Sequence, residues 1–260
     1  MPLRSPISRA AGIVRSLVMY YGPLWRRRRM EAFYRQFLNP GDLAFDIGSH
    51  VGNRVRTFRR IGARVVAIEP QPDLVALLRL LYGRDSEATL EACGLAAESG
   101  QGELHLSTRT PTVSTFANSW IGEVQADRRF RRLRWDTVVK VPLVTLDELI
   151  ARHGEPQFCK IDVEGFELEV LTGLTRPVPA LSFEYIPVSS ARAIACVERT
   201  SALGDYRYRY SRVETHRWAV DIWLDAEAMI EVLKALPLLD RSGDVYAVRS
   251  DQLSSSGPGR

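Results

Sequence analysis

Apolar residues recur along this chain in two patterns that alternate with each other. Short apolar runs are typical of strands, and apolar residues spaced three or four positions apart are typical of helices. The strands predicted in the first part of the chain are Leu43–Ile47, Arg64–Ile68, Ala88–Glu91, Gly102–Ser107, Val138–Leu143, Phe158–Val163 and Ala180–Tyr185. The predicted helices include Val51–Ile61, Pro72–Tyr82, one opening at Thr145, one beginning near Phe166, and Ser190–Ala202. This alternation predicts an α/β fold with a doubly wound, mostly parallel sheet.

The last part of the chain continues the pattern with more aromatic residues. Tyr206–Tyr210 alternates tyrosine with arginine, which places the tyrosines on one face of a strand. Trp218–Leu224 and Val245–Val248 are predicted strands, separated by a helix that starts at Asp225. Tyrosines on a covered sheet face pack in the core, so this pattern does not indicate a platform for stacking nucleic-acid bases.

Three segments follow from the distribution of these elements. Residues 1–38 form a basic N-terminal extension with helical spacing, residues 39–250 form one domain, and residues 251–260 are predicted to be a disordered tail. Residues 108–136 show little periodicity and contain two tryptophans and several arginines. Long irregular segments inside a compact domain usually act as lids or binding loops, and we expect residues 108–136 to do so.

The most informative stretch lies at the end of the first predicted strand. In Phe45-Asp46-Ile47-Gly48-Ser49-His50-Val51-Gly52-Asn53, a strand runs into a Gly-x-x-x-Gly turn and then into a helix. The second predicted strand ends in Glu69, 17 residues after Gly52. In such a unit the glycines let the backbone approach a ligand, and the acid accepts hydrogen bonds from ribose hydroxyls. The turn lacks the glycine spacing that cradles a pyrophosphate. A ligand with a ribose and no phosphate therefore fits better, and S-adenosylmethionine is the common one.

Other polar residues fall at or near the carboxyl ends of predicted strands. Ligands of doubly wound sheets bind at those ends, so we expect these residues near one site. The cofactor-binding candidates are Asp46, Gly48, Ser49, Gly52, Glu69, Cys93 and Asp162. His50 lies inside the turn, where a proton-shuttling role and a ring turned to solvent are alternatives. Glu184 is a candidate for the acceptor pocket, with a helix cap or a surface carboxylate as the alternatives.

Charge and cysteine content bear on the kind of partner and on the redox compartment. The formal net charge is +4, and arginines are concentrated in Arg26–Arg29 and Arg128–Arg134. Such blocks suit phosphates of nucleic acid, lipid headgroups or sugar nucleotides, although solvated surface is the commoner explanation of a single block. Cys93, Cys159 and Cys196 have no metal-ligand spacing and form no Cys-x-x-Cys pair, which favours a reducing cytoplasm.

The N-terminal extension does not resemble a signal peptide. Its apolar stretch is short, carries Arg15, and is followed by arginines rather than by a cleavage site. Ile13, Leu17, Tyr20 and Leu24 fall at helical spacing, and Met30, Phe33, Tyr34 and Phe37 form a second amphipathic pattern. Peripheral contact of residues 10–37 with the inner membrane surface is one hypothesis. Packing of this segment on the domain and simple disorder are the alternatives.

Several motifs together resemble the FkbM family of S-adenosylmethionine-dependent methyltransferases. The matching segments are Phe45–Asn53, Ala67–Pro70, Val144–Leu149, Lys160–Glu167, Val170–Gly173, Phe183–Glu184 and Asp244–Val248. The Lys-Ile-Asp-Val-Glu-Gly segment is fairly specific to the family, and the glycine turn is shared by methyltransferases generally. The resemblance implies a Rossmann-like class I methyltransferase with a seven-stranded sheet and an antiparallel last hairpin. It also implies O-methylation of a sugar, glycolipid or natural-product hydroxyl.

Methyl transfer to a hydroxyl requires an in-line arrangement and benefits from a base that removes the hydroxyl proton. Asp162 is the first candidate for that base because it lies at a central strand end. Glu164 either shares this work or binds a divalent cation that acidifies the hydroxyl. The spacing of the acidic residues does not support a metal site, so no metal ligand is assigned. The alternatives are that Asp162 only binds the cofactor's ammonium group and that Glu164 caps the next helix.

Three other classes of protein would account for fewer of these sequence features. An RNA methyltransferase would account for the arginine blocks, but no RNA-binding module is recognisable, so a nucleic-acid partner is disfavoured. A nicotinamide-dependent oxidoreductase would need the pyrophosphate-binding glycine that is missing here. A non-catalytic, membrane-associated protein that retains the fold is the remaining alternative, and the intact glycine turn, Glu69 and Asp162 count against it.

Overall fold

A computed structural model describes residues 12, 14–17, 24–107, 110, 113–125 and 133–254. Its main element is a seven-stranded sheet with the order β3-β2-β1-β7-β8-β10-β9. The strands of this sheet are β1 Leu43–Ile47, β2 Arg64–Ile68, β3 Ala88–Glu91, β7 Phe158–Ile161, β8 Ala180–Tyr185, β9 Tyr206–Arg212 and β10 Gly243–Arg249. Strands β3, β2, β1, β7 and β8 are parallel, and β10 runs antiparallel to both β8 and β9. The expected mostly parallel sheet with an antiparallel last hairpin is therefore confirmed.

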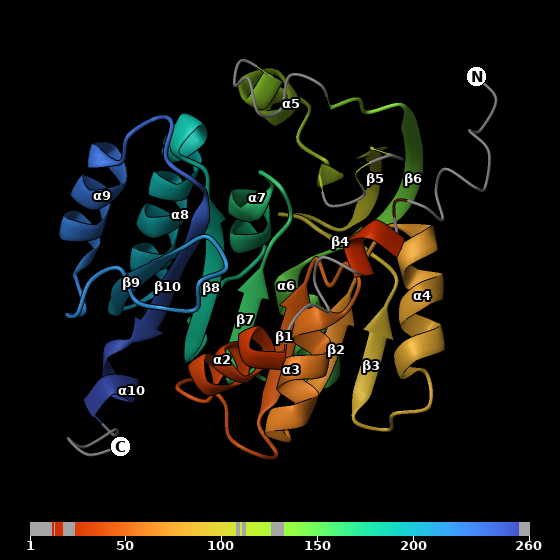
Figure 1. The fold of residues 1–260 in the computed structure, drawn as a ribbon, viewed down its shortest axis with the longest axis horizontal. Helices are drawn as coiled ribbons and strands as arrows, with labels where there is room; N and C mark the ends of the chain where they lie inside the picture. The colour runs from red at the N-terminus through yellow and green to blue at the C-terminus, as the bar shows by residue number, and fades with distance from the viewer. Residues whose placement is uncertain are drawn as a thin grey trace.

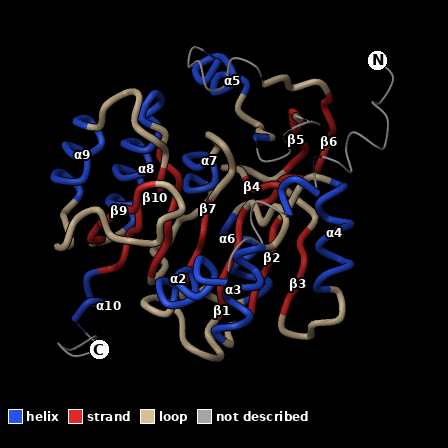
Figure 2. The backbone as a smooth tube through the Cα atoms, viewed as in Figure 1, coloured by secondary structure: helices blue, strands red, loops and turns tan. Residues whose placement is uncertain are grey.

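Helices cover both faces of this sheet (Figures 1 and 2). Their bounds are α2 Leu24–Tyr34, α3 Asn53–Ile61, α4 Pro72–Tyr82, α5 Asn118–Gln125, α6 Leu146–His153, α7 Glu167–Thr172, α8 Ser190–Leu203, α9 Ala226–Ala235 and α10 Ser250–Ser254. A short 3-10 turn, Pro187–Ser189, precedes α8. Among the described residues, no helix combines the length and apolar character needed to cross a bilayer.

A second, three-stranded sheet lies beyond the carboxyl ends of the parallel strands, at the upper right of Figure 1. It has the order β4-β6-β5, with β4 Gly94–Leu95, β5 Gly100–Leu106 and β6 Thr137–Val144. The β5–β6 pair is antiparallel. The small sheet and α5 thus stand over the edge of the main sheet where ligands of this fold bind.

Two predictions of local structure from the sequence were wrong. Residues 108–136 are not wholly irregular, because α5 lies within them with Trp120 fully buried. Trp218–Leu224 is not a strand; it makes only isolated bridges, Ser211 to Trp218 and Tyr208 to Leu224. Trp218 packs instead against Phe33 and under the Arg209 guanidinium, so its apolar character serves packing rather than strand pairing.

The alternation of side chains along each strand divides the core into two clusters. In β1, Phe45 and Ile47 face the cluster formed with α6, α7, α8 and α9, whereas Ala44 faces the cluster formed with α2 and α3. Tyr206, Tyr208 and Tyr210 are all buried on the first of these faces, as predicted.

The predicted N-terminal extension is partly integral to the domain. Met30, Phe33, Tyr34 and Phe37 are all buried in the cluster with α3. Of the apolar residues that suggested a membrane-facing helix, Ile13 and Tyr20 lie outside the described residues. The predicted tail begins with α10, and residues 255–260 also lie outside them. Of the second arginine block, Arg134 alone is described, and it is exposed.

We expect Phe33→Ala to destabilise the whole domain. Phe33 is 4% exposed and its ring contacts those of Tyr34, Phe37, Trp218 and Tyr246. Losing a buried phenylalanine typically costs about 3–5 kcal/mol. Trp25→Ala on the same helix is the matched control, because Trp25 is 54% exposed. Urea unfolding of the full chain should show a large loss only for Phe33→Ala, and equal losses would contradict an integral α2.

Candidate active site

The turn between β1 and α3 is shaped by its two glycines. Gly48 has a φ of 84°, and a Cβ atom there would lie 1.9 Å from the backbone oxygen of Asp162. Gly52 has a φ of 78°, and a Cβ atom there would lie 2.6 Å from the Tyr82 ring. A side chain at either position would clash with its neighbour and strain the backbone, so the turn requires glycine at both.

Glu69, at the end of β2, holds this turn in place. Its Oε2 accepts a hydrogen bond from the backbone N–H of His50 at 2.8 Å, and its Oε1 accepts one from that of Gln71 at 2.9 Å. Burial raises the pKa of Glu69 to about 7. A carboxylate has about four acceptor sites, so Glu69 can accept hydrogen bonds from a ligand while it orders the turn.

A cleft of about 430 Å³, part of it open to solvent, lies beside the turn. Five of the residues singled out in the sequence line it together: Gly48, His50, Glu69, Asp162 and Glu164. Strand β5 and the segment that follows it contribute further lining residues, namely Leu104, Ser114 and Phe116. The convergence expected at the carboxyl ends of β1, β2 and β7 is therefore present.

The other cofactor-binding candidates do not line the cleft. Ser49 is buried and its Oγ donates to the backbone oxygen of Asp46 at 2.7 Å. Asp46 is 1% exposed and neither carboxylate oxygen has a hydrogen-bond partner among the described residues. Burial raises the pKa of Asp46 to about 6. Cys93 is buried in the larger core cluster, where burial raises the pKa of its thiol to about 11.

His50 lines the cleft with a φ of 50°, which is uncommon for a residue other than glycine. Burial lowers the pKa of the imidazole to about 4. The ring is therefore neutral near pH 7. A neutral imidazole can pass a proton between its two nitrogens, and the role of His50 as a shuttle stays a prediction.

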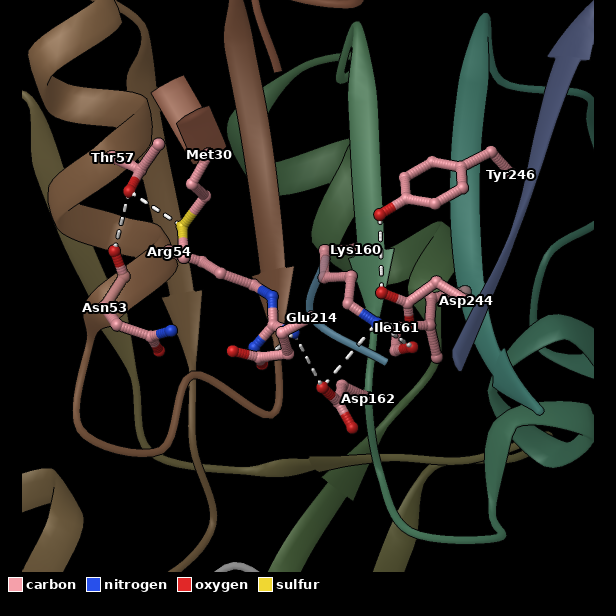
Figure 3. A network of polar contacts seen from close by, with 10 residues as sticks. All are labelled: Met30, Asn53, Arg54, Thr57, Lys160, Ile161, Asp162, Glu214, Asp244 and Tyr246. Atoms are coloured by element: carbon pink, nitrogen blue, oxygen red, sulfur yellow. Dashed lines mark hydrogen bonds and ion pairs between the residues drawn. The ribbon is translucent and has the colours of Figure 1, made fainter. Parts of the chain in front are cut away.

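Asp162 is fixed by two buried cations that reach it from different elements (Figure 3). The Lys160 Nζ atom lies 3.6 Å from Asp162 Oδ2, and the Arg54 Nη2 atom lies 3.4 Å from the same oxygen. Each cation has a second carboxylate, since Lys160 Nζ lies 2.7 Å from Asp244 Oδ1 and Arg54 Nη2 lies 2.9 Å from Glu214 Oε1. Neither contact was predicted from the sequence, although a lysine inside a buried strand indicates a buried partner.

These cations determine the ionisation of Asp162. Burial alone would raise the pKa of its carboxyl, but the nearby Lys160 and Arg54 outweigh burial and lower it below the ordinary aspartate value. Asp162 is therefore ionised at every pH near neutrality. A carboxylate held in this state is a good ligand for a cation and a weak acceptor of protons.

Three carboxylates converge next to this network. One ligand oxygen each from Asp162, Glu164 and Glu184 lies within 4.8 Å of the others. Burial, Glu184 and Asp162 raise the pKa of Glu164 well above its ordinary value, and burial and Asp162 do the same for Glu184. Glu184 Oε2 is buried and has no hydrogen-bond partner in the described part of the chain. The sequence predicted no metal ligands, but this arrangement of oxygen donors can hold a divalent cation.

The turn that presents Glu164 is ordered in the same way as the glycine turn. Glu167 Oε1 accepts hydrogen bonds from the backbone N–H groups of Val163 at 3.1 Å and Gly165 at 3.2 Å. Glu164 has a φ of 54°, and the Thr115 hydroxyl donates to its backbone oxygen at 2.7 Å. A Cβ atom at Gly165 would lie 2.3 Å from the Trp120 ring. The turn is therefore clamped between α7 and α5.

A smaller cavity of about 220 Å³ adjoins the carboxylates on the side of α5 and α8. Glu184, Glu167 and Trp120 are among its lining residues. Arg192 crosses this region: its guanidinium lies 2.8 Å from Glu123 Oε1 and donates to the backbone oxygen of Gly165 at 2.9 Å. Helix α5 is thereby tied to both α8 and the Glu164 turn. Glu184 lines this cavity, whereas Asp162 and Glu164 line the larger cleft.

The site lies within a segment of the chain that matches a known protein family. The family model described as the Methyltransferase FkbM domain matches residues 46–210, which is more than half of the chain. The match includes the glycine turn, Glu69 and all three clustered carboxylates. None of the curated proteins matches this chain.

Two solved structures are among those to which this chain is similar. Precorrin-6y C5,15-methyltransferase from Geobacter metallireducens is 11% identical, with a TM-score of 0.47 over 86% of this chain and 87% of that chain. A TehB-like SAM-dependent methyltransferase from Corynebacterium glutamicum is 10% identical, with a TM-score of 0.47 over 94% of this chain and 100% of that chain. Both likenesses are distant, so only the family match bears on function.

The raised pKa values of the site predict how stability changes with pH. Glu69, Glu164 and Glu184 hold protons in the folded protein to a higher pH than in the unfolded chain, so their contribution is lost as pH rises through the folded pKa. His50 and His216 have pKa values lowered to about 4 in the folded protein, whereas in the unfolded chain they release their protons near the ordinary pKa of about 6.5. Their contribution therefore opposes the loss and is nearly complete above pH 7. In metal-free buffer, the free energy of unfolding should fall between pH 7 and 8. The slope is expected to be at most about 1.4 kcal/mol per pH unit for each proton released.

Glu184→Gln should make this slope shallower because it removes one of the repelling carboxylates. Glu198→Gln, an exposed position on α8, is the control and should leave the slope unchanged. Denaturant unfolding at four pH values measures the effect. A wild-type stability that rises over this range, or a slope that Glu184→Gln leaves unaltered, would contradict the electrostatic description of the site.

Proposed function

Because the chain belongs to the FkbM family of S-adenosylmethionine-dependent methyltransferases, we propose that it methylates a hydroxyl of a sugar, glycolipid or natural-product acceptor. The observation that carries the choice of a hydroxyl is the cluster of Asp162, Glu164 and Glu184 at the edge of the cofactor cleft. A hydroxyl is a poor nucleophile until its proton is removed, and buried carboxylates are suited to assist that removal. An acceptor that was already a good nucleophile would have no need of them.

The residues around the glycine turn fit the cofactor. S-adenosylmethionine supplies a methyl group already activated on a sulfonium. Gly48 leaves the backbone open to close approach, and Glu69 retains acceptor capacity for ribose hydroxyls. The ionised carboxylate of Asp162 lines the cleft, which favours a ligand bearing an ammonium group and a sulfonium.

The opposite pKa shifts of the carboxylates suit them to two different roles. The sequence prediction made Asp162 the base, but its lowered pKa suits it better to holding a cationic group in place. The pKa values of Glu164 and Glu184 are raised, so these side chains are better matched to accepting a proton from the acceptor hydroxyl. We therefore propose that Asp162 orients, and that Glu164 with Glu184 forms the catalytic pair.

A divalent cation is the second way in which this cluster could act. Asp162, Glu164 and Glu184 would be its ligands, and its charge would acidify a bound hydroxyl. The same charge would relieve the repulsion that raises the pKa values of Glu164 and Glu184. In this proposal the acceptor approaches the cluster from the smaller cavity, which Glu184 lines and Glu69 does not.

Cofactor binding tests the first part of the proposal. We expect S-adenosylhomocysteine to bind the purified full chain and Glu69→Ala to weaken that binding at least tenfold, about 1.4 kcal/mol. Glu87→Ala, at an exposed position just before β3, should bind like the wild type. Titration calorimetry measures both, with NAD as the competing ligand. Binding of NAD in preference to S-adenosylhomocysteine would contradict the proposal.

Cation binding tests the carboxylate cluster separately from turnover. Mn²⁺ should bind with one high-affinity site, and Glu184→Gln should weaken this binding at least tenfold because it replaces an anionic ligand with a neutral one. Glu198→Gln is the control. Electron paramagnetic resonance of free Mn²⁺ measures the titration without an acceptor. If Mn²⁺ binds equally to both variants, the cluster is not its site, and proton transfer by the glutamates remains the proposal.

A further inference from the structure

Each of the two cations beside Asp162 lies closer to another carboxylate than to Asp162 itself (Figure 3). Arg54 Nη2 lies 2.9 Å from Glu214 Oε1 and 3.4 Å from Asp162 Oδ2. Lys160 Nζ lies 2.7 Å from Asp244 Oδ1 and 3.6 Å from Asp162 Oδ2. An N–H···O hydrogen bond typically spans about 2.7–3.2 Å. Both cations are therefore bonded to their second carboxylate and are held a little away from Asp162.

Arg54 reaches its two carboxylates with a single nitrogen. Nη2 makes both contacts, and the buried Nε atom has no hydrogen-bond partner among the described residues. The side chain of Arg54 is 9% exposed, whereas that of Glu214 is 40% exposed. A buried guanidinium is strongly unfavourable without an anionic partner. If Glu214 lost its charge, Nη2 would therefore be drawn toward Asp162.

The turn that carries Glu214 has an unusual backbone. Val213 has a φ of 52° and His216 a φ of 49°, and a positive φ is rare for a β-branched residue. Such conformations persist only where the surrounding structure enforces them, and they cluster at functional sites. The backbone N–H of Val213 donates to the backbone oxygen of Ser242 at 2.8 Å. His216 is buried, with its ring against that of Phe33. These contacts fix the turn and hold Glu214 beside the cation.

One hairpin supplies both of the carboxylates that hold the cations. Asp244 lies in β10 opposite Ser211 of β9, and Glu214 lies in the turn that follows β9. Neither Asp244 nor Glu214 lines the cofactor cleft, whereas Asp162 does. The antiparallel end of the sheet thus acts on the site through the cations, without facing the cofactor.

We propose that Glu214 is a positioning residue that holds Arg54 back, so that the Asp162 carboxylate stays available to the ammonium group of the cofactor. The inference rests on the proposed function, in which Asp162 holds that group. At its present distance Arg54 favours the ionised form of Asp162. A guanidinium that closed on Asp162 would instead occupy the carboxylate oxygens with charge-assisted hydrogen bonds and would compete with the cofactor.

Two substitutions of Glu214 test this role in the full chain. Glu214→Gln removes the charge and keeps the length of the side chain, so Arg54 loses its closer anionic partner. Glu214→Asp keeps the charge and should recover part of the wild-type behaviour. Glu198→Gln, at an exposed position on α8, controls for the loss of a surface carboxylate. Because Glu214 is 40% exposed, both variants should fold, which circular dichroism checks.

Two ligands separate a positioning role from a structural one. S-adenosylhomocysteine carries the ammonium group, whereas 5′-methylthioadenosine keeps the nucleoside and the sulfur and lacks the amino-acid end. In metal-free buffer, calorimetry should show that Glu214→Gln weakens S-adenosylhomocysteine binding about tenfold, because a charge-assisted contact is lost. Glu214→Asp should weaken it less, and Glu198→Gln should leave it unchanged. Binding of 5′-methylthioadenosine should stay at the wild-type level in all three variants.

The two ligands also define the results that would overturn the role of Glu214. Equal weakening of both ligands by Glu214→Gln would mean that Glu214 only supports the fold. Unchanged binding of S-adenosylhomocysteine to Glu214→Gln would mean that Arg54 needs no restraint. In both cases the wild type still binds S-adenosylhomocysteine and the proposed function stands. A wild type that does not bind S-adenosylhomocysteine would contradict the proposed function and the role of Glu214 together.

Discussion

The site depends on a lysine that has no access to water. Lys160 lies in the central strand β7, is 0% exposed, and has Asp162 on one side and Asp244 on the other. An isolated ammonium in this place would be strongly unfavourable, so the two carboxylates and the fold that presents them are required together. The interaction also sets the chemistry, because the same cation, together with Arg54, keeps Asp162 ionised at the edge of the cleft.

The charges that surround this lysine are unequal in number. The two cations, Lys160 and Arg54, face three carboxylates: Asp162, Asp244 and Glu214. In the described structure, Glu164 and Glu184 have no comparable cation of their own. Burial and the neighbouring carboxylates together raise the pKa values of Glu164 and Glu184. A site with a surplus of half-buried carboxylates favours cationic ligands, so the same charge distribution suits the sulfonium cofactor of the family and a divalent cation.

The sequence predicted the elements that depend on local pattern. The strands, the glycine turn and Glu69 were found because a turn with two left-handed glycines and an acid at the next strand end is visible within 25 or so residues. The contact of Glu184 with Asp162 and Glu164 was not predicted, because it depends on β8 lying next to β7, and strand order is a property of the whole sheet. The pairing of Arg54 with Asp162 depends on the same long-range arrangement.

Two local misassignments have the same origin. Helix α5 was not recognised because its eight residues carry only Trp120 and Val124 as buried positions, too few for a clear helical period. Trp218–Leu224 was predicted to be a strand because of its apolar and aromatic residues. Its Trp218 ring in fact packs against Phe33 and under the Arg209 guanidinium. In both cases a tertiary contact, not a local preference, decides the conformation.

Carboxyl ¹³C NMR titration of the metal-free full chain, assigned with Asp162→Asn and Glu184→Gln, tests the central claim most directly. The account predicts that Asp162 titrates below the ordinary aspartate pKa of about 3.9, and that Glu184 titrates well above the ordinary glutamate pKa of about 4.3. The reverse order, with Asp162 holding its proton while Glu184 is ionised, would contradict the role of Lys160 and with it the proposed division of labour among the carboxylates.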